Sequence, residues 1–108
     1  MASYLIIESR DLTEYTSGRY IQRVALQLKE DGHEVILFLI ENGVIAARKG
    51  CEVGKGLSNL AGRGAKVMAE EVSCRARGID ALSDGVTRES LDHLADLIVE
   101  GSDKVMWY

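Results

Sequence analysis

Cys74 is the residue of this 108-residue chain that is best suited to covalent chemistry, because a predicted helix begins close to it. Backbone N–H groups and the helix dipole at such a position favour a thiolate. Arg75 and Arg77 add positive charge, so Cys74 is a candidate to attack a sulfur donor or to carry a persulfide. Nearby Glu70 and Glu71 carboxylates raise a thiol pKa. An ordinary, half-buried cysteine without a chemical role is the alternative.

Polar residues also follow the second apolar run, at positions 41–50. Asn42, Gly43 and Arg48 are the candidate binding residues there, alongside Glu70, Glu71, Arg75 and Arg77. In a parallel α/β sheet, such positions lie outside the carboxyl ends of the strands, where these folds build their sites. Two readings stay open for the glutamates: they bind a ligand with the arginines, or they form solvated salt bridges.

Other motifs do not predict a cofactor or a metal. The segment 50–55 is one residue short of a phosphate-binding loop, and Gly56 replaces the Ser or Thr that binds magnesium. His33 and His93 do not flank cysteines at metal-ligand spacing. Cys51 is expected in a loop, either as an exposed thiol near Cys74 or as a spacer, and the spacer is favoured because no charge pattern around it favours a thiolate.

The elements that must position these residues alternate between strand and helix, as in an α/β sandwich. Apolar runs predict strands at 4–7, 35–40, 66–69 and 104–108, and residues 80–86 are expected to form a loop that can end in a small fifth strand. A periodic stretch predicts a helix over 21–28, and shorter helices are expected over 43–49 with Asn42 as N-cap, over 57–61 and over 73–77. Thr87 is expected to cap the last helix. Its buried face is predicted to consist of Leu91, Leu94, Ala95 and Ile98.

Composition limits the class of protein. The chain contains 46% hydrophobic residues and has a net charge of −4, which predicts one folded domain over residues 1–108 and argues against nucleic acid as a partner. No apolar run approaches the roughly 20 residues of a membrane span, and the N-terminus does not resemble a secretion signal. Two separated cysteines make the cytoplasm the expected location.

Four segments together resemble the DsrE-like family: residues 4–11, 35–50, 70–79 and 104–107. The resemblance covers nearly the whole chain. It implies a three-layer α/β/α sandwich around a mainly parallel sheet of four to five strands. It also implies a homo-oligomer, commonly a trimer or a hexamer, and partners among other sulfur-relay proteins. In the sulfur-carrying relatives, a cysteine at the carboxyl end of the third strand holds a persulfide. In this chain Glu70 and Glu71 occupy that position, and Cys74 follows three residues after Glu71.

Two functions therefore stay open. In the first, the protein is a sulfur carrier or sulfurtransferase: Cys74 bears the persulfide, Arg75 and Arg77 stabilise its anion, and Asn42 and Gly43 shape the neighbouring wall. Such a thiol reacts well below the pKa of ~8.5 of a free cysteine. In the second, the protein is a non-catalytic oligomeric scaffold or small-ligand-binding protein that uses the same polar rim. The sequence does not decide whether the protein is an enzyme.

Overall fold

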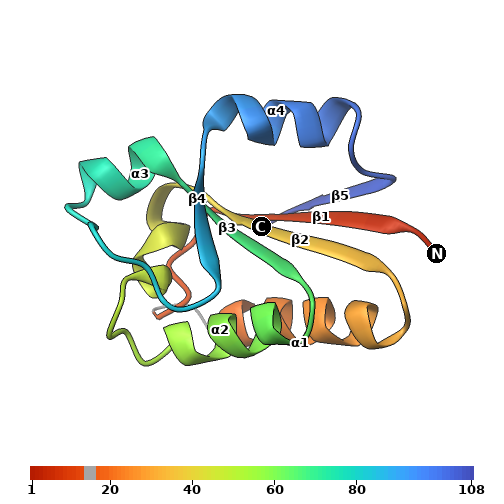
Figure 1. Cartoon of the computed structure of the whole chain (residues 1–108), viewed down its shortest axis with the longest axis horizontal. Helices are drawn as coiled ribbons and strands as arrows, with labels where there is room; N and C mark the ends of the chain where they lie inside the picture. The colour runs from red at the N-terminus through yellow and green to blue at the C-terminus, as the bar shows by residue number, and fades with distance from the viewer. Residues whose placement is uncertain (14–16) are drawn as a thin grey trace.

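The computed structural model describes residues 1–13 and 17–108 as a parallel sheet with helices on both faces (Figure 1). The strands are β1 (Ser3–Glu8), β2 (Glu34–Leu39), β3 (Lys66–Glu70), β4 (Val86–Glu89) and β5 (Lys104–Trp107). The helices are α1 (Ser17–Glu30), the 3-10 helix η1 (Glu41–Ala47), α2 (Gly54–Gly62), α3 (Glu71–Ala76) and α4 (Leu91–Val99).

The sheet has five strands in the order β4-β3-β2-β1-β5, and every neighbouring pair is parallel. This confirms the predicted sandwich. The apolar runs that form β1 and β2 occupy the middle of the sheet, where both faces are covered. Because all strands run the same way, their carboxyl ends meet at one rim, and Glu8, Leu39 and Glu70 end three adjacent strands there.

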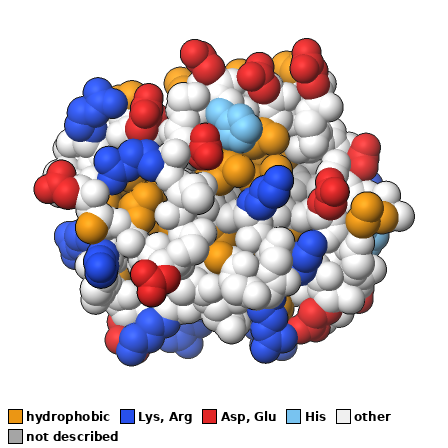
Figure 2. Space-filling view, in the orientation of Figure 1, with side chains coloured by type: hydrophobic (Ala, Val, Ile, Leu, Met, Phe, Trp, Pro, Cys, Tyr) orange, Lys and Arg blue, Asp and Glu red, His pale blue; other side chains and the backbone are white. Residues whose placement is uncertain are grey.

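The two faces of the sheet are covered unequally. Helices α1 and α2 lie on one face and enclose the larger apolar cluster, which includes Leu37 and Leu39 (Figure 1). On the other face, α4 contributes Leu94 to a smaller cluster with Leu5 and Phe38. One helix does not cover a five-stranded sheet, so hydrophobic side chains remain visible below α4 (Figure 2).

The prediction for the last helix was wrong in its start and its buried face. Thr87 belongs to β4, and Ser90 caps α4 by accepting a hydrogen bond from the His93 N–H at 3.1 Å. Residues 86–89 pair with β3, so the helix begins later than predicted. Its inward side is formed by Leu94 and the half-buried Leu97, whereas three predicted core residues are exposed: Leu91, Ala95 and Ile98.

The prediction for the segment after β2 was also wrong in detail. This segment is a 3-10 helix, and its N-cap is Ile40, without a side-chain cap, in place of Asn42. Glu41, its first residue, takes a left-handed conformation with φ of 50°. Helix α2 begins at Gly54, one turn before the predicted start. None of the helices in residues 1–13 and 17–108 is long and apolar enough to cross a membrane.

Candidate functional site

Glu70 forms the junction between β3 and α3 at the carboxyl rim. Its Oε1 accepts hydrogen bonds from the Ser73 N–H at 2.9 Å and the Ser73 hydroxyl at 2.7 Å, and its Oε2 accepts one from the Val72 N–H at 2.6 Å. Burial acts to raise the pKa of this carboxyl, but these hydrogen bonds and the charge of Arg75 outweigh burial, so the pKa is lowered. Glu70 is therefore an ionised N-cap at pH 7.

Ser73 links this cap to η1. Its Oγ also accepts a hydrogen bond from the Glu41 N–H at 2.9 Å, which fixes the left-handed conformation of Glu41. A glutamate with positive φ is strained by about 1 kcal/mol, and strain of this kind concentrates at functional sites. The hydrogen bonds of Ser73 to Glu70 and Glu41 therefore fix the conformation of this part of the carboxyl rim.

Arg77, the C-cap of α3, joins the end of this helix to η1. Its Nε and Nη2 donate to Asn42 Oδ1 at 3.1 and 3.0 Å, and its Nη1 donates to the Ser73 carbonyl at 3.1 Å. Arg77 Nη2 also lies 3.4 Å from Glu41 Oε2. Three predicted site residues are therefore joined through Ser73: Asn42, Glu70 and Arg77. Ser73 itself was not among the predicted site residues.

Cys74 lies on the inner side of α3, within the larger apolar cluster, and its side chain is 0% exposed. Burial, together with the nearby Glu70 charge, raises the pKa of its thiol, although Arg88 and Arg77 act to lower it. The predicted helix is present but begins at Glu71, two residues earlier than expected, so Cys74 is its fourth residue. The thiol is fully buried and not half-buried. Arg88 comes from β4, and its guanidinium donates to the Ile79 and Asp80 carbonyls at 3.2 and 3.0 Å.

The remaining candidate residues lie around this network. Gly43 packs directly against the carbonyl oxygen of Glu8, which a Cβ at this position would meet. Glu71 is half-buried in the first turn of α3, and Arg75 is exposed. The backbone of the exposed Arg48 forms an isolated bridge with Leu82.

Cys51 is half-buried and lines a separate hollow beside the start of α2. Lys49, Lys55 and Ser83 border the same hollow. Among residues 1–13 and 17–108, no three His, Cys, Asp or Glu side chains gather in a way that could hold a metal ion. The chemistry that the rim supports is polar recognition through carboxylate, amide and guanidinium groups.

Glu8 is a buried carboxyl at the end of β1. Its Oε1 accepts a hydrogen bond from the Arg10 N–H at 3.0 Å, and its Oε2 has no hydrogen-bond partner among the described residues. Burial raises the pKa of this carboxyl, against the opposing effects of the Arg10 N–H and the Arg10 charge. A group with a raised pKa stabilises the fold below its unfolded pKa, and this stability is lost as pH rises through the folded pKa.

We therefore expect Glu8→Gln to raise the free energy of unfolding by about 1 kcal/mol at pH 7, because the neutral amide removes a buried charge. Chemical denaturation at pH 7 and near pH 4 measures this, and the gain is expected to shrink at the lower pH. Glu34→Gln, at an exposed site on β2, is the control and is expected to change little. A Glu8→Gln variant that is less stable at pH 7 would contradict this account of the Glu8 charge.

Comparison with known proteins assigns the chain to a family. A family model described as "DsrH like protein" matches residues 20–104, a stretch that includes the whole rim from Glu41 to Arg77. The chain belongs to this DsrH-like family. The family is part of the DsrE/DsrF/DsrH sulfur-relay family and works in a complex, so the resemblance read from the sequence is confirmed. Among curated proteins, no sequence matches the chain.

Solved structures share the fold of this DsrH-like protein. The ychN protein from E. coli is 24% identical over 100% of both chains, with a TM-score of 0.91. A protein of unknown function from Methanobacterium thermoautotrophicum is 22% identical over 96% of both chains, with a TM-score of 0.79. Another, from Bacteroides thetaiotaomicron, is 17% identical over 99% of this chain and 95% of its own, with a TM-score of 0.84. These likenesses concern the fold alone.

Proposed function

We propose that this DsrH-like protein is a non-catalytic, homo-oligomeric subunit of a cytoplasmic sulfur-relay system, and not a carrier of persulfide on Cys74. It binds a small polar ligand or a relay partner at the rim formed by Glu41, Asn42, Glu70, Ser73 and Arg77. The observation that carries this proposal is the Glu70 carboxylate, which occupies the first N–H groups of α3 at the end of β3.

The place of Glu70 matters because sulfur-carrying relatives hold their reactive cysteine at the carboxyl end of the third strand. Backbone N–H groups at a helix start favour an anion such as a thiolate or a persulfide. In this chain the Val72 and Ser73 N–H groups already bind the Glu70 carboxylate. The Glu70 carboxylate is therefore the anion at this helix start, which supports a structural role for the junction between β3 and α3.

The surroundings of Cys74 support the same conclusion. A persulfide carrier needs a thiolate that a sulfur donor can reach. Burial instead raises the pKa of the Cys74 thiol and closes it off from solvent. To expose this thiol, α3 has to leave the core, which breaks the hydrogen bonds that tie it to η1, namely those of Arg77 to Asn42 Oδ1 and of the Glu41 N–H to Ser73 Oγ.

The rim and the apolar surface support a binding role in an assembly. Asn42 and Glu41 are exposed and Arg77 is half-buried, so carboxylate, amide and guanidinium groups face a polar ligand or partner. Large hydrophobic side chains are exposed on β5 and α4, among them Trp107 and Val99. Such exposure is typical of a surface that another subunit covers, and the family resemblance implies trimers or hexamers.

Thiol labelling tests the proposal. In a Cys51→Ser variant, Cys74 is the one remaining thiol, and we expect it to react at least about 100-fold more slowly in the folded protein than in denaturant, because labelling requires local opening. Cys74→Ala leaves Cys51 as the matched reference, and its assembly and partner binding are expected to match wild type. Rapid labelling of folded Cys51→Ser that approaches the rate in denaturant would support the carrier function instead.

A further inference from the structure

The two edges of the sheet differ in how they are protected against pairing. β4, at one edge, carries the polar residues Thr87, Arg88 and Glu89. β5, at the other edge, carries Val105, Met106 and Trp107 after a single lysine. Natural edge strands avoid self-association with charged side chains, prolines or bulges, and the apolar part of β5 has none of these devices.

The backbone of β5 offers hydrogen-bonding groups at its open side. The Tyr108 N–H donates to the Ile7 carbonyl at 2.8 Å, and the Tyr108 carbonyl accepts from the Ser9 N–H at 2.8 Å, so both groups of Tyr108 face β1. In a parallel ladder this direction alternates along the strand. Val105 and Trp107 therefore point their N–H and C=O groups away from β1, toward the open edge.

Apolar side chains flank this edge on the α4 face. Val105 pairs with Leu5 and Trp107 with Ile7, and paired residues share a face, so both side chains lie on the side of α4. Trp107 is 62% exposed and Val105 is 42% exposed. The exposed residues of α4 at i, i+4 and i+7 add to the apolar surface of this face: Leu91, Ala95 and Ile98.

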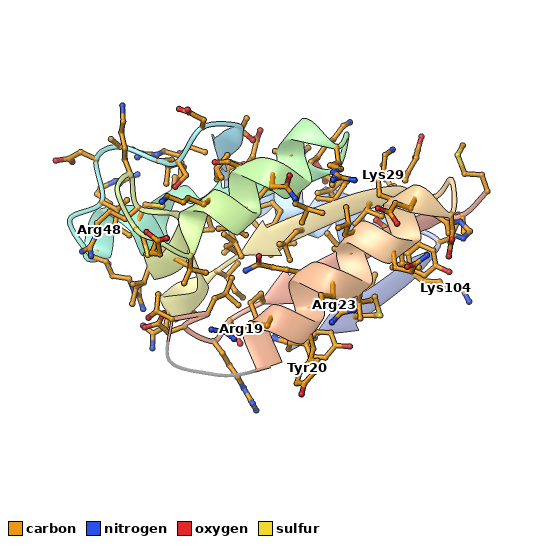
Figure 3. The ribbon with its side chains drawn as sticks, turned by 90° about the horizontal axis from the view of Figure 1, so that it is seen from below. Arg19, Tyr20, Arg23, Lys29, Arg48 and Lys104 are labelled. Atoms are coloured by element: carbon orange, nitrogen blue, oxygen red, sulfur yellow. The ribbon has the colours of Figure 1, made fainter. Side chains whose placement is uncertain are left out.

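The opposite face of the same edge is also apolar. Tyr20 on α1 is 65% exposed, and it projects from the side of the helix that faces away from α2 and toward β5 (Figure 3). Val24, one turn later, is exposed as well. The stripe ends at Asp31, which accepts a hydrogen bond from the Gln27 side chain at 3.0 Å. Arg23 lies beside Tyr20 near the start of α1 (Figure 3), and Asp31 directly follows the last residue of α1, so these two positions at the ends of the stripe carry opposite charges.

We propose that a second copy of this chain pairs with β5 in antiparallel fashion across a two-fold axis at Met106. In this register Val105 of one copy lies opposite the partner's Trp107 on the α4 face, and both residues exchange backbone hydrogen bonds. The same axis sets Arg23 of one α1 against the acidic end of the partner's α1 at Asp31. The edge is thus complementary to itself in hydrogen bonds, apolar surface and charge. The inference rests on the proposed homo-oligomer and names one of its contacts: a two-fold contact joins two copies, and in a hexamer it joins two trimers.

Trp107 is the single tryptophan of the chain, so its fluorescence reports directly on this contact. We expect the emission of wild type to shift to the blue as concentration rises, in step with an increase of mass in sedimentation. Val105→Lys places a charge at the centre of the apolar pair and is expected to weaken self-association at least about 100-fold. Thr87→Lys adds the same charge to the same sheet face at the β4 edge, and is expected to change self-association by less than about 2-fold.

Circular dichroism checks that Val105→Lys gives a folded protein. If it does not, Tyr20→Glu, on the exposed side of α1, tests the same contact. This variant is expected to weaken the same contact while Trp107 still reports. An assembly that Val105→Lys and Tyr20→Glu leave intact would overturn the β5 contact while the homo-oligomer stands. A wild-type protein that stays monomeric at all concentrations would overturn both the contact and the homo-oligomer. The non-carrier role of Cys74 is tested separately by its labelling.

Discussion

Glu70→Ala is expected to lower the free energy of unfolding by about 3 kcal/mol, because the substitution removes an N-cap and leaves the buried Ser73 without its acceptor. Ser73 in turn orients the N–H of Glu41, so the conformation of η1 is expected to loosen as well. Chemical denaturation measures the free energy, and amide hydrogen exchange at Val72, Ser73 and Glu41 measures the loosening.

The pH dependence of this loss identifies its cause. Because the folded pKa of Glu70 is lowered, its contribution to stability is present above the unfolded pKa and is lost as pH falls through the folded pKa. The difference between wild type and Glu70→Ala is therefore expected to shrink in acid. Glu71→Ala is the matched control and is expected to cost less than about 1 kcal/mol. Equal losses in the two variants would show that the cap geometry of Glu70 is not what stabilises α3.

Gly43→Ala is the second substitution with a large expected effect. A Cβ at this position meets the carbonyl oxygen of Glu8, a backbone atom at the end of β1 that also accepts the N–H of Ile40 at 3.0 Å. Neither side of the contact yields easily, so we expect η1 to shift away from β1 and the free energy of unfolding to fall by about 3 kcal/mol.

The control for Gly43→Ala is Gly62→Ala at the end of α2, where an added Cβ meets nothing within 4 Å. There the alanine is expected to raise the free energy of unfolding by about 0.5 kcal/mol, because it restricts the unfolded chain. Thermal unfolding of the two variants side by side distinguishes a steric effect from a general effect of alanine. A Gly43→Ala protein as stable as wild type would mean that η1 does not pack against β1 as described.

The sequence predicts most of the sheet because its strands are buried on both faces and are therefore continuous apolar runs, as in residues 35–40. It places β4 too early, as a small strand at the end of the 80–86 loop, since an edge strand with the sequence Val-Thr-Arg-Glu has one buried residue and no apolar pattern. Because of that error, the sequence predicts the N-cap of the last helix at Thr87 in place of Ser90. It also places the exposed Leu91 and Ile98 on the buried face of this helix.

The candidate site could be predicted in its place but not in its contacts. Asn42, Glu70 and Arg77 meet at one rim because parallel strands end there, which the strand order along the chain already implies. The hydrogen bonds of Ser73 and the position of the Arg88 charge near Cys74 depend on how α3 is rotated about its axis. The Glu70 cap sets that rotation, and it also turns Cys74 into the core, where a six-residue helix gives no periodic signal.

The measurement that tests the central proposal most directly is intact-mass analysis after incubation with a sulfur donor. Wild type, Cys74→Ser and Cys51→Ser are compared while folded. We expect Cys51→Ser to gain no sulfur, because Cys74 is buried and its pKa is raised. A gain of sulfur atoms on wild type and Cys51→Ser, but not on Cys74→Ser, would place a persulfide on Cys74 and contradict the proposal that this DsrH-like protein is not a sulfur carrier.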